Sequence, residues 1–124
     1  MKNENIIAEK SKGFAVRIVK LCQALQEDRR EYVLSRQLMK SGTSIGANVR
    51  EAGRGQTRAG FYTKLTIALK EADETSYWLE LLKEGDCLDE AAFETVYAEC
   101  QELIRLLTAI TKTIRNKNST TEKM

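Results

Sequence analysis

The stretch QLMKSGTSIGANVREAGRGQ, residues Gln37 to Gln56, decides the fold, because it holds four of the chain's seven glycines. Such a segment either cradles a phosphate or lets a helix pack closely against its neighbours. A phosphate-binding loop of the Walker type requires G-x-x-x-x-G-K-[ST] after a strand, and this stretch has neither the lysine nor the strand. The residues that share one helical face are Leu34, Leu38, Ser41, Ile45, Val49 and Ala52. The stretch therefore predicts a helix, with Asn48 at the edge of that face and Gly42, Ser44 and Gly46 in close contact with a neighbour.

Helical spacing of apolar residues continues on both sides of this stretch. It predicts a first helix from about Asn5 to Gln26, which ends at the charged segment EDRRE, residues 27–31. The second helix ends at the Gly-Arg-Gly of residues 53–55, where the backbone is permissive. The core positions expected in the first helix are Ile7, Phe14, Ile18, Leu21 and Leu25.

Heptad spacing marks two further helices. Thr57 is the expected N-cap of the third helix, which ends at Gly85. Asp89 is the expected N-cap of the fourth, with Leu88 and Phe93 placed as a hydrophobic staple. The third helix carries Phe61, Leu65, Ala68, Ala72, Thr75, Leu79 and Leu82, and the fourth Phe93, Val96, Cys100, Leu103, Leu107, Ile110 and Ile114.

The composition agrees with an all-α fold. The chain has 124 residues and no proline, which suits one domain built from long helices. Four long helices joined by short connections predict an antiparallel up-down-up-down four-helix bundle over residues 1–117. The polar residues 118–124 have nothing to bury, so we expect a disordered tail.

The residue inventory argues against an enzyme. The chain has no histidine, which removes the commonest general base and the usual metal ligand. Its three cysteines, Cys22, Cys87 and Cys100, lack the spacing of a zinc site and are expected to be small core residues or bystanders. We therefore expect no catalytic residues, no metal and no cofactor. No segment has the length of a signal peptide or membrane span, which predicts a cytoplasmic protein with no membrane partner.

Charge is segregated along the chain. Residues 1–64 hold 13 basic and 6 acidic side chains, whereas Lys83 is the one cation among eleven carboxylates between Glu71 and Glu102. On the second helix, four cations occupy one stripe of about 27 Å opposite the apolar face. Two more cations continue it into the third helix, so the expected phosphate-binding residues are Arg36, Lys40, Arg50, Arg54, Arg58 and Lys64. An ordinary solvated face is the alternative, although such faces usually mix charges of both signs.

The third helix also has a second apolar surface, away from its heptad positions. A helix of a monomeric bundle needs only one apolar stripe, so a second stripe that contains a tryptophan suggests contact with another copy of the chain. The residues concerned are Ile67, Tyr77, Trp78 and Leu81. A single wide stripe, half covered by neighbouring helices, would explain the same pattern.

Three segments carry a family resemblance: SRQLMKSGTSIGANVREA (35–52), FYTKLTIALKEADETSYWLELL (61–82) and LIRLLTAITKTI (103–114). Together they resemble the bacterial 23S rRNA intervening sequence proteins. The resemblance implies a four-helix bundle that assembles as a homopentamer. It also extends to the accessory variability protein of diversity-generating retroelements, which binds nucleic acid and a reverse transcriptase. Gly60 departs from the family pattern, where an acid completes a capping box with the residue at the position of Thr57.

These observations lead to two functional hypotheses. The first is a non-enzymatic homo-oligomer that binds RNA or DNA through phosphate contacts from the basic residues. The second is a protein-interaction or scaffold module whose basic face docks an acidic protein surface, which could be the Glu71–Glu102 region of its own neighbour. A small helical ribonuclease, a third class, has no support from a chain without histidine.

Overall fold

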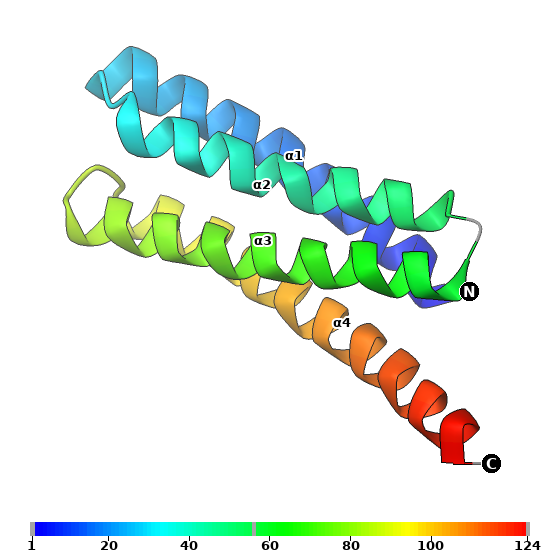
Figure 1. Cartoon of the computed structure of the whole chain (residues 1–124). Helices are drawn as coiled ribbons and strands as arrows, with labels where there is room; N and C mark the ends of the chain where they lie inside the picture. Colours follow the sequence, from blue (N-terminus) through cyan, green and yellow to red (C-terminus); the bar gives the residue numbers. More distant parts are fainter. Residues whose placement is uncertain (1, 56, 124) are drawn as a thin grey trace.

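The protein is all-α. The computed structural model describes residues 2–55 and 57–123, with side chains described for 4–55 and 57–117, and these residues contain no strand. The helices in chain order are α1 (Lys2–Arg29), α2 (Val33–Gly53), α3 (Arg58–Glu84) and α4 (Glu90–Lys123) (Figure 1). Each helix packs against its neighbours in the chain, and α4 also contacts α1, which closes the ring. The all-α prediction is confirmed.

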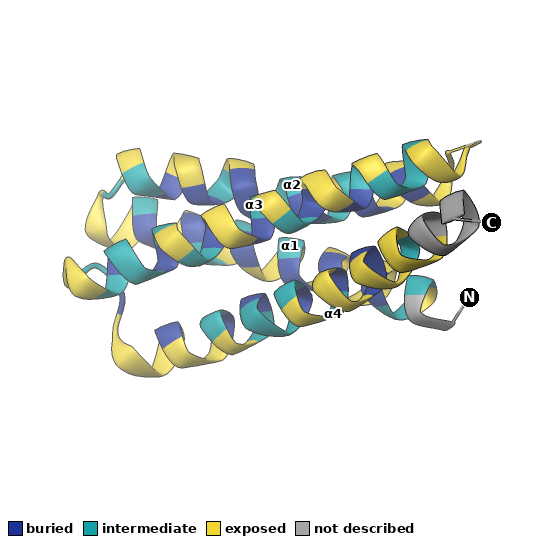
Figure 2. Cartoon of the chain, turned by 60° about the horizontal axis from the view of Figure 1, so that its bottom comes forward, coloured by how far each residue is buried: buried dark blue, intermediate teal, exposed yellow. Residues whose placement is uncertain are grey.

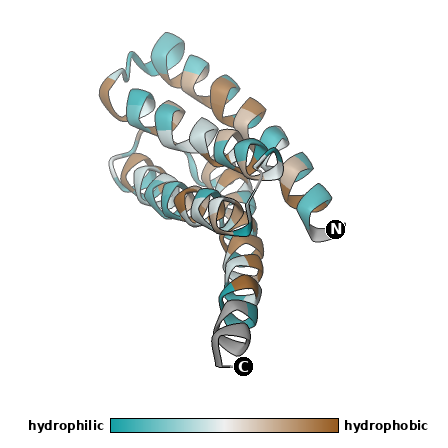
Figure 3. Ribbon diagram, turned by 45° about the vertical axis from the view of Figure 1, so that its right-hand side comes forward, coloured by the Kyte–Doolittle hydropathy of each residue, from teal (hydrophilic) through white to brown (hydrophobic). Residues whose placement is uncertain are grey.

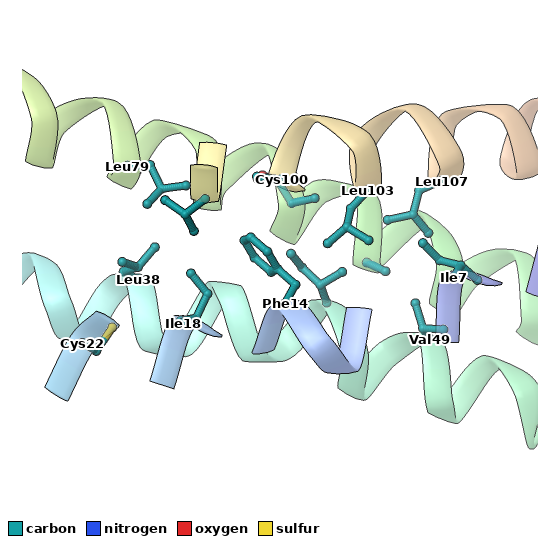
Figure 4. Packing of buried hydrophobic residues seen from close by; sticks show 14 of the residues in the cluster. Ile7, Phe14, Ile18, Cys22, Leu38, Val49, Leu79, Cys100, Leu103 and Leu107 are labelled. Carbon is teal, nitrogen blue, oxygen red and sulfur yellow. The ribbon is translucent and has the colours of Figure 1, made fainter. Parts of the chain in front are cut away.

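The core runs along the centre of the four helices, on the faces that the apolar spacing predicts. Figure 2 shows the buried residues turned inward on every helix, and Figure 4 shows Phe14 between side chains of the other helices. Four expected members, Leu21, Leu34, Phe61 and Ile114, are only partly buried. Next to Leu21 and Leu34, the adjacent Cys22 and Ser35 are fully buried instead. These small residues face each other where α1 and α2 come close, since the Cys22 Sγ donates to the Ser35 carbonyl at 3.3 Å.

The connection from α1 to α2 differs from the sequence prediction. Helix α1 continues through Glu27, Asp28 and Arg29, so charge alone does not end it. It ends at Arg30, which adopts the left-handed conformation with φ 53°. Glu31 then caps α2, because its carboxylate accepts from the backbone N–H groups of Leu34 at 2.9 Å and Ser35 at 2.7 Å.

The other two helix starts have the predicted caps. The Thr57 side chain accepts from the Gly60 N–H at 2.9 Å, so α3 begins in place although the acid of a capping box is missing. Asp89 accepts from the Ala92 N–H at 2.8 Å, and Leu88 and Phe93 are both buried, as expected of a staple. Helix α3 ends at its C-cap Gly85, as predicted.

The glycines of α2 allow α1 to approach closely, as predicted. A Cβ atom on Gly42 would lie 2.9 Å from side-chain atoms of Ile18, and one on Gly46 would lie 3.2 Å from the backbone oxygen of Ser11. Asn48 is partly buried and donates to the Ser44 carbonyl at 2.8 Å. The glycine stretch is therefore a packing surface within a helix.

Ion pairs connect the first half of helix α4 to α1. In the described part of the chain, these pairs include Lys10 to Glu102 at 2.5 Å and Arg17 to Glu99 at 2.6 Å. Beyond them the second half of α4 diverges from the other helices, as Figures 1 and 3 show. The helix is continuous to Lys123, but side chains after residue 117 lie outside the described part, so the disorder of 118–124 stays a prediction. None of the described helices is long and apolar enough to cross a bilayer.

Candidate nucleic-acid interface

Helix α2 carries three of the six predicted basic residues on its exposed face. Arg36, Lys40 and Arg50 are exposed on the helix. Arg54 is the C-cap residue that follows the helix, so the 3.6-residue repeat of α2 does not determine where its side chain points. Arg58 is exposed at the first position of α3. These five residues, Arg36, Lys40, Arg50, Arg54 and Arg58, are called the basic surface below.

Lys64, the sixth predicted residue, is partly neutralised. Its Nζ lies 3.1 Å from the Oε2 of Glu51 on α2, and the ion pair is about half exposed. Lys64 is therefore a weaker phosphate ligand than predicted, because a phosphate must compete with Glu51. The sequence pattern missed this pair, because it joins two helices and has no fixed spacing along one of them.

The five residues of the basic surface have no carboxylate within 4.0 Å in the described part of the chain. The nearest electrostatic influence is that of Lys40 on Glu71 of α3. Burial and the neighbouring Glu74 raise the pKa of Glu71, while Lys40 and Lys70 act to lower it. Lys10, Arg17 and Lys83 form ion pairs, whereas other exposed cations such as Lys20 and Lys70 also have no carboxylate within 4.0 Å among the described residues. The basic surface is therefore distinguished by its grouping, because its cations lie on the exposed face of α2 and in the turn that leads into α3.

A hollow of about 760 Å³ lies beside the basic surface, between α1, α2 and the start of α3. Small residues form much of its lining, among them Ala8 and Ala15 of α1 and Gly46 and Ala47 of α2. The cations that line it are Lys12, Arg50 and Arg54, together with the carboxylates Glu4 and Glu51. Lys12 was not predicted as a site residue, because only the packing of α1 against α2 places it at the same hollow as Arg50.

A second hollow, of about 520 Å³, lies where α4 diverges from the turn between α2 and α3. Its apolar lining comes from Phe61 on α3 and from Ile110 and Ile114 on α4. Arg58 and Lys117 also line it. Three residues, Glu4, Gly53 and Phe61, line both hollows, so the two are adjacent around the end of the molecule.

The predicted oligomer residues divide into two kinds. Ile67 is 37% exposed and Tyr77 54% exposed. Trp78 and Leu81 are partly buried. Trp78 packs against the core, but because it is not fully buried, part of the residue remains on the surface. The Trp78 Nε1 donates to Glu74 at 3.3 Å, and the Tyr77 ring lies edge-on to it at 5.3 Å between centroids.

The cysteines have the environment of core residues. Cys22 and Cys100 are fully buried, and burial raises the pKa of their thiols to about 11 and about 12. The Cys100 Sγ donates to the Ala72 carbonyl at 3.3 Å. Among the described residues no group of three or more Cys, Asp or Glu is arranged to hold a metal ion.

The fold and its surface define a small all-α protein with a basic face whose five cations have no carboxylate partner among the residues with described side chains. The chain belongs to the 23S rRNA-intervening sequence protein family, whose model matches residues 3–109. It is similar to a protein of unknown function from the S23 ribosomal protein family of Bacteroides thetaiotaomicron VPI-5482, known from a crystal structure, with 47% identity and a TM-score of 0.87. That match covers 89% of this chain and 98% of the other. No curated protein matches the chain.

Proposed function

We propose that the protein is a non-enzymatic homo-oligomer that binds RNA or DNA through phosphate contacts from the basic surface. The observation that carries the proposal is the set of five exposed cations without a carboxylate partner among the described residues. Unpaired arginine and lysine side chains release counterions from a polyanion when they bind it, which supplies affinity without sequence specificity.

Two further features support this proposal. Short connections of residues 30–32, 54–57 and 85–89 favour an antiparallel up-down-up-down bundle, in which one face of α2 packs against its neighbours and the basic face stays exposed. The names of the family and of its Bacteroides relative refer to 23S rRNA and to a ribosomal protein, so RNA is the first probe to use. A pentameric state and a reverse-transcriptase partner rest on the sequence resemblance alone.

A protein-docking function is the second candidate, and the Glu51–Lys64 pair favours it. In that pair, a carboxylate of the chain neutralises a lysine next to the basic surface, and an acidic protein partner would make the same kind of contact with the other cations. Exposed carboxylates such as Asp73, Glu84 and Glu94 lie on α3 and α4 and could reach the basic surface of a second copy. This function predicts little affinity for a free polyanion.

The test is the salt dependence of oligonucleotide binding. Each phosphate contact lowers the slope of log K against log salt by about 0.9 on duplex DNA or 0.7 on single strands. We expect the double variant Arg50→Gln, Arg54→Gln to bind every sequence more weakly and to flatten the slope by about 1.4 to 1.8 per engaged protomer. Fluorescence anisotropy with a labelled oligonucleotide between about 50 and 300 mM salt measures both quantities.

The matched control replaces two exposed lysines outside the basic surface, Lys20 and Lys70, by glutamine. The two double variants lose the same net charge, so only a loss of specific contacts separates them. If the parent shows no salt-dependent binding at low ionic strength, nucleic-acid binding is excluded. If the Arg50, Arg54 variant dissociates into monomers, the basic surface pairs with the acidic surface of a neighbouring subunit.

A further inference from the structure

The two hollows, together called the trough below, share three lining residues, and one of these is the aromatic Phe61. Phe61 is partly buried, packs against the core and lines both hollows. Gly53 also lines both, and Gly55 lines the second hollow, so these two positions add no side chain to the trough. The hollows' volumes, about 760 and 520 Å³, fall in the usual range for small-ligand sites.

The charge around the trough suits a phosphate chain. Among the described residues that line it, the cations are Lys12, Arg50, Arg54, Arg58 and Lys117. The carboxylates are Glu4 and Glu51, and Glu51 is already paired with Lys64 at 3.1 Å. Positive charge therefore remains in excess on both sides of Phe61.

We propose that this trough binds a single-stranded nucleic acid, with one base stacked on Phe61 and the flanking phosphates on Arg50, Arg54 and Arg58. The inference rests on the proposed function and makes it specific. A phosphate-lined groove with an aromatic platform is the arrangement that suits single strands, because every base has a π-face to stack. A duplex keeps its bases inside the helix and cannot insert one into a hollow unless it unpairs.

The preference for single strands separates this inference from charge alone. A surface that binds through charge only favours a duplex over a single strand of equal length, because the duplex has the higher charge density. Stacking on an aromatic side chain contributes a factor of roughly 5 to 150 per base, which reverses that order. We therefore expect the protein to bind a single-stranded 12-mer more tightly than the corresponding duplex at equal salt.

The first experiment uses the unaltered protein. A labelled single-stranded oligothymidylate is compared, by fluorescence anisotropy, with an oligonucleotide of the same length and charge whose central positions are abasic. Because both carry the same phosphates, only the loss of stacking lowers the affinity, and we expect a decrease of at least fivefold with an unchanged salt slope. Equal affinity for the two would overturn the base-stacking inference.

The second experiment changes the ring. Phe61→Leu should lower the affinity for the single strand by the same factor and leave duplex binding unchanged, whereas Phe61→Tyr keeps an aromatic face and should bind within twofold of the parent. Leu69→Ala serves as the control for lost packing, since Leu69 packs against the core but lines neither hollow. Unchanged single-strand binding by folded Phe61→Leu refutes the inference and leaves the proposed function standing. Absence of binding by the parent to any oligonucleotide refutes both.

Discussion

At the residue scale, single side chains decide how closely the helices approach. Gly42 and Gly46 leave α2 without side chains at two positions that face α1. Each mid-helix glycine costs about 1 kcal/mol relative to alanine in helix preference. The close contacts with Ile18 and Ser11 explain why the small residues are nevertheless suited to these positions.

Replacement of Gly46 by leucine tests this packing. Its Cβ alone would lie 3.2 Å from the backbone oxygen of Ser11, so the larger side chain must push α1 away. We expect the free energy of unfolding to fall by about 1 to 3 kcal/mol, measured by urea denaturation.

Gly13 provides the matched control, because no neighbouring atom lies within 4 Å of a Cβ placed there. Gly13→Leu introduces the same side chain into a helix without a close contact, and it should leave stability unchanged or raise it by up to about 1 kcal/mol. If both variants become more stable, helix preference rather than packing governs Gly46.

At the element scale, the helix ends show what a sequence can and cannot reveal. Thr57 and Asp89 were predicted as caps because each lies just before a helical pattern, and both accept the expected backbone N–H. Glu31 was not, because it lies within a run of charges that resembles a solvated loop. Its role depends on the left-handed Arg30 that turns the chain before α2, a backbone conformation that residue types alone do not indicate.

We expect Glu31→Ala to lower the stability by about 1 to 2 kcal/mol, since two backbone N–H groups at the start of α2 lose their acceptor. Thermal unfolding followed by circular dichroism measures the change. Glu27→Ala, which removes an exposed carboxylate from the last turns of α1, is the control and should change stability by less than about 0.5 kcal/mol. An equal loss in both variants would show that net charge, not capping, stabilises this connection.

The sites were less predictable than the helices for a similar reason. The spacing within α2 was enough to predict a basic stripe, because a helix repeats every 3.6 residues. The Glu51–Lys64 pair, and the presence of Lys12 and Arg50 at the same hollow, depend on how two helices are placed beside each other. Phe61 was predicted as a core residue, and it lines the second hollow together with residues of the diverging α4 and the first hollow together with residues of α1 and α2.

At the scale of the whole molecule, a single chain leaves much surface exposed. Its accessible area is 7886 Å², compared with about 6,700 Å² expected for a compact monomer of this mass. The diverging second half of α4 and the elongated shape contribute to this excess (Figure 3). Ile67 and Tyr77 contribute apolar side chains on the outer side of α3.

This apolar surface predicts association of the chain with itself. Ile67 and Tyr77 are exposed enough to be changed without loss of core packing, whereas Trp78 also packs against the core. We expect the parent to exceed the 14.1 kDa of one chain, and a pentamer would have a mass of about 70 kDa. The double variant Ile67→Glu, Tyr77→Glu should dissociate to the monomer, because charged groups buried at an interface without partners are costly.

Light scattering behind a sizing column, at micromolar concentrations, measures these masses directly. Val16→Glu is the matched control, since Val16 is 49% exposed on α1 and lies outside the proposed interface, so its variant should keep the parent's mass. Dissociation by Val16→Glu instead would place the interface on α1. A parent that remains monomeric would show that the apolar surface of α3 serves another partner, and a multivalent basic surface would then no longer be available to strengthen polyanion binding.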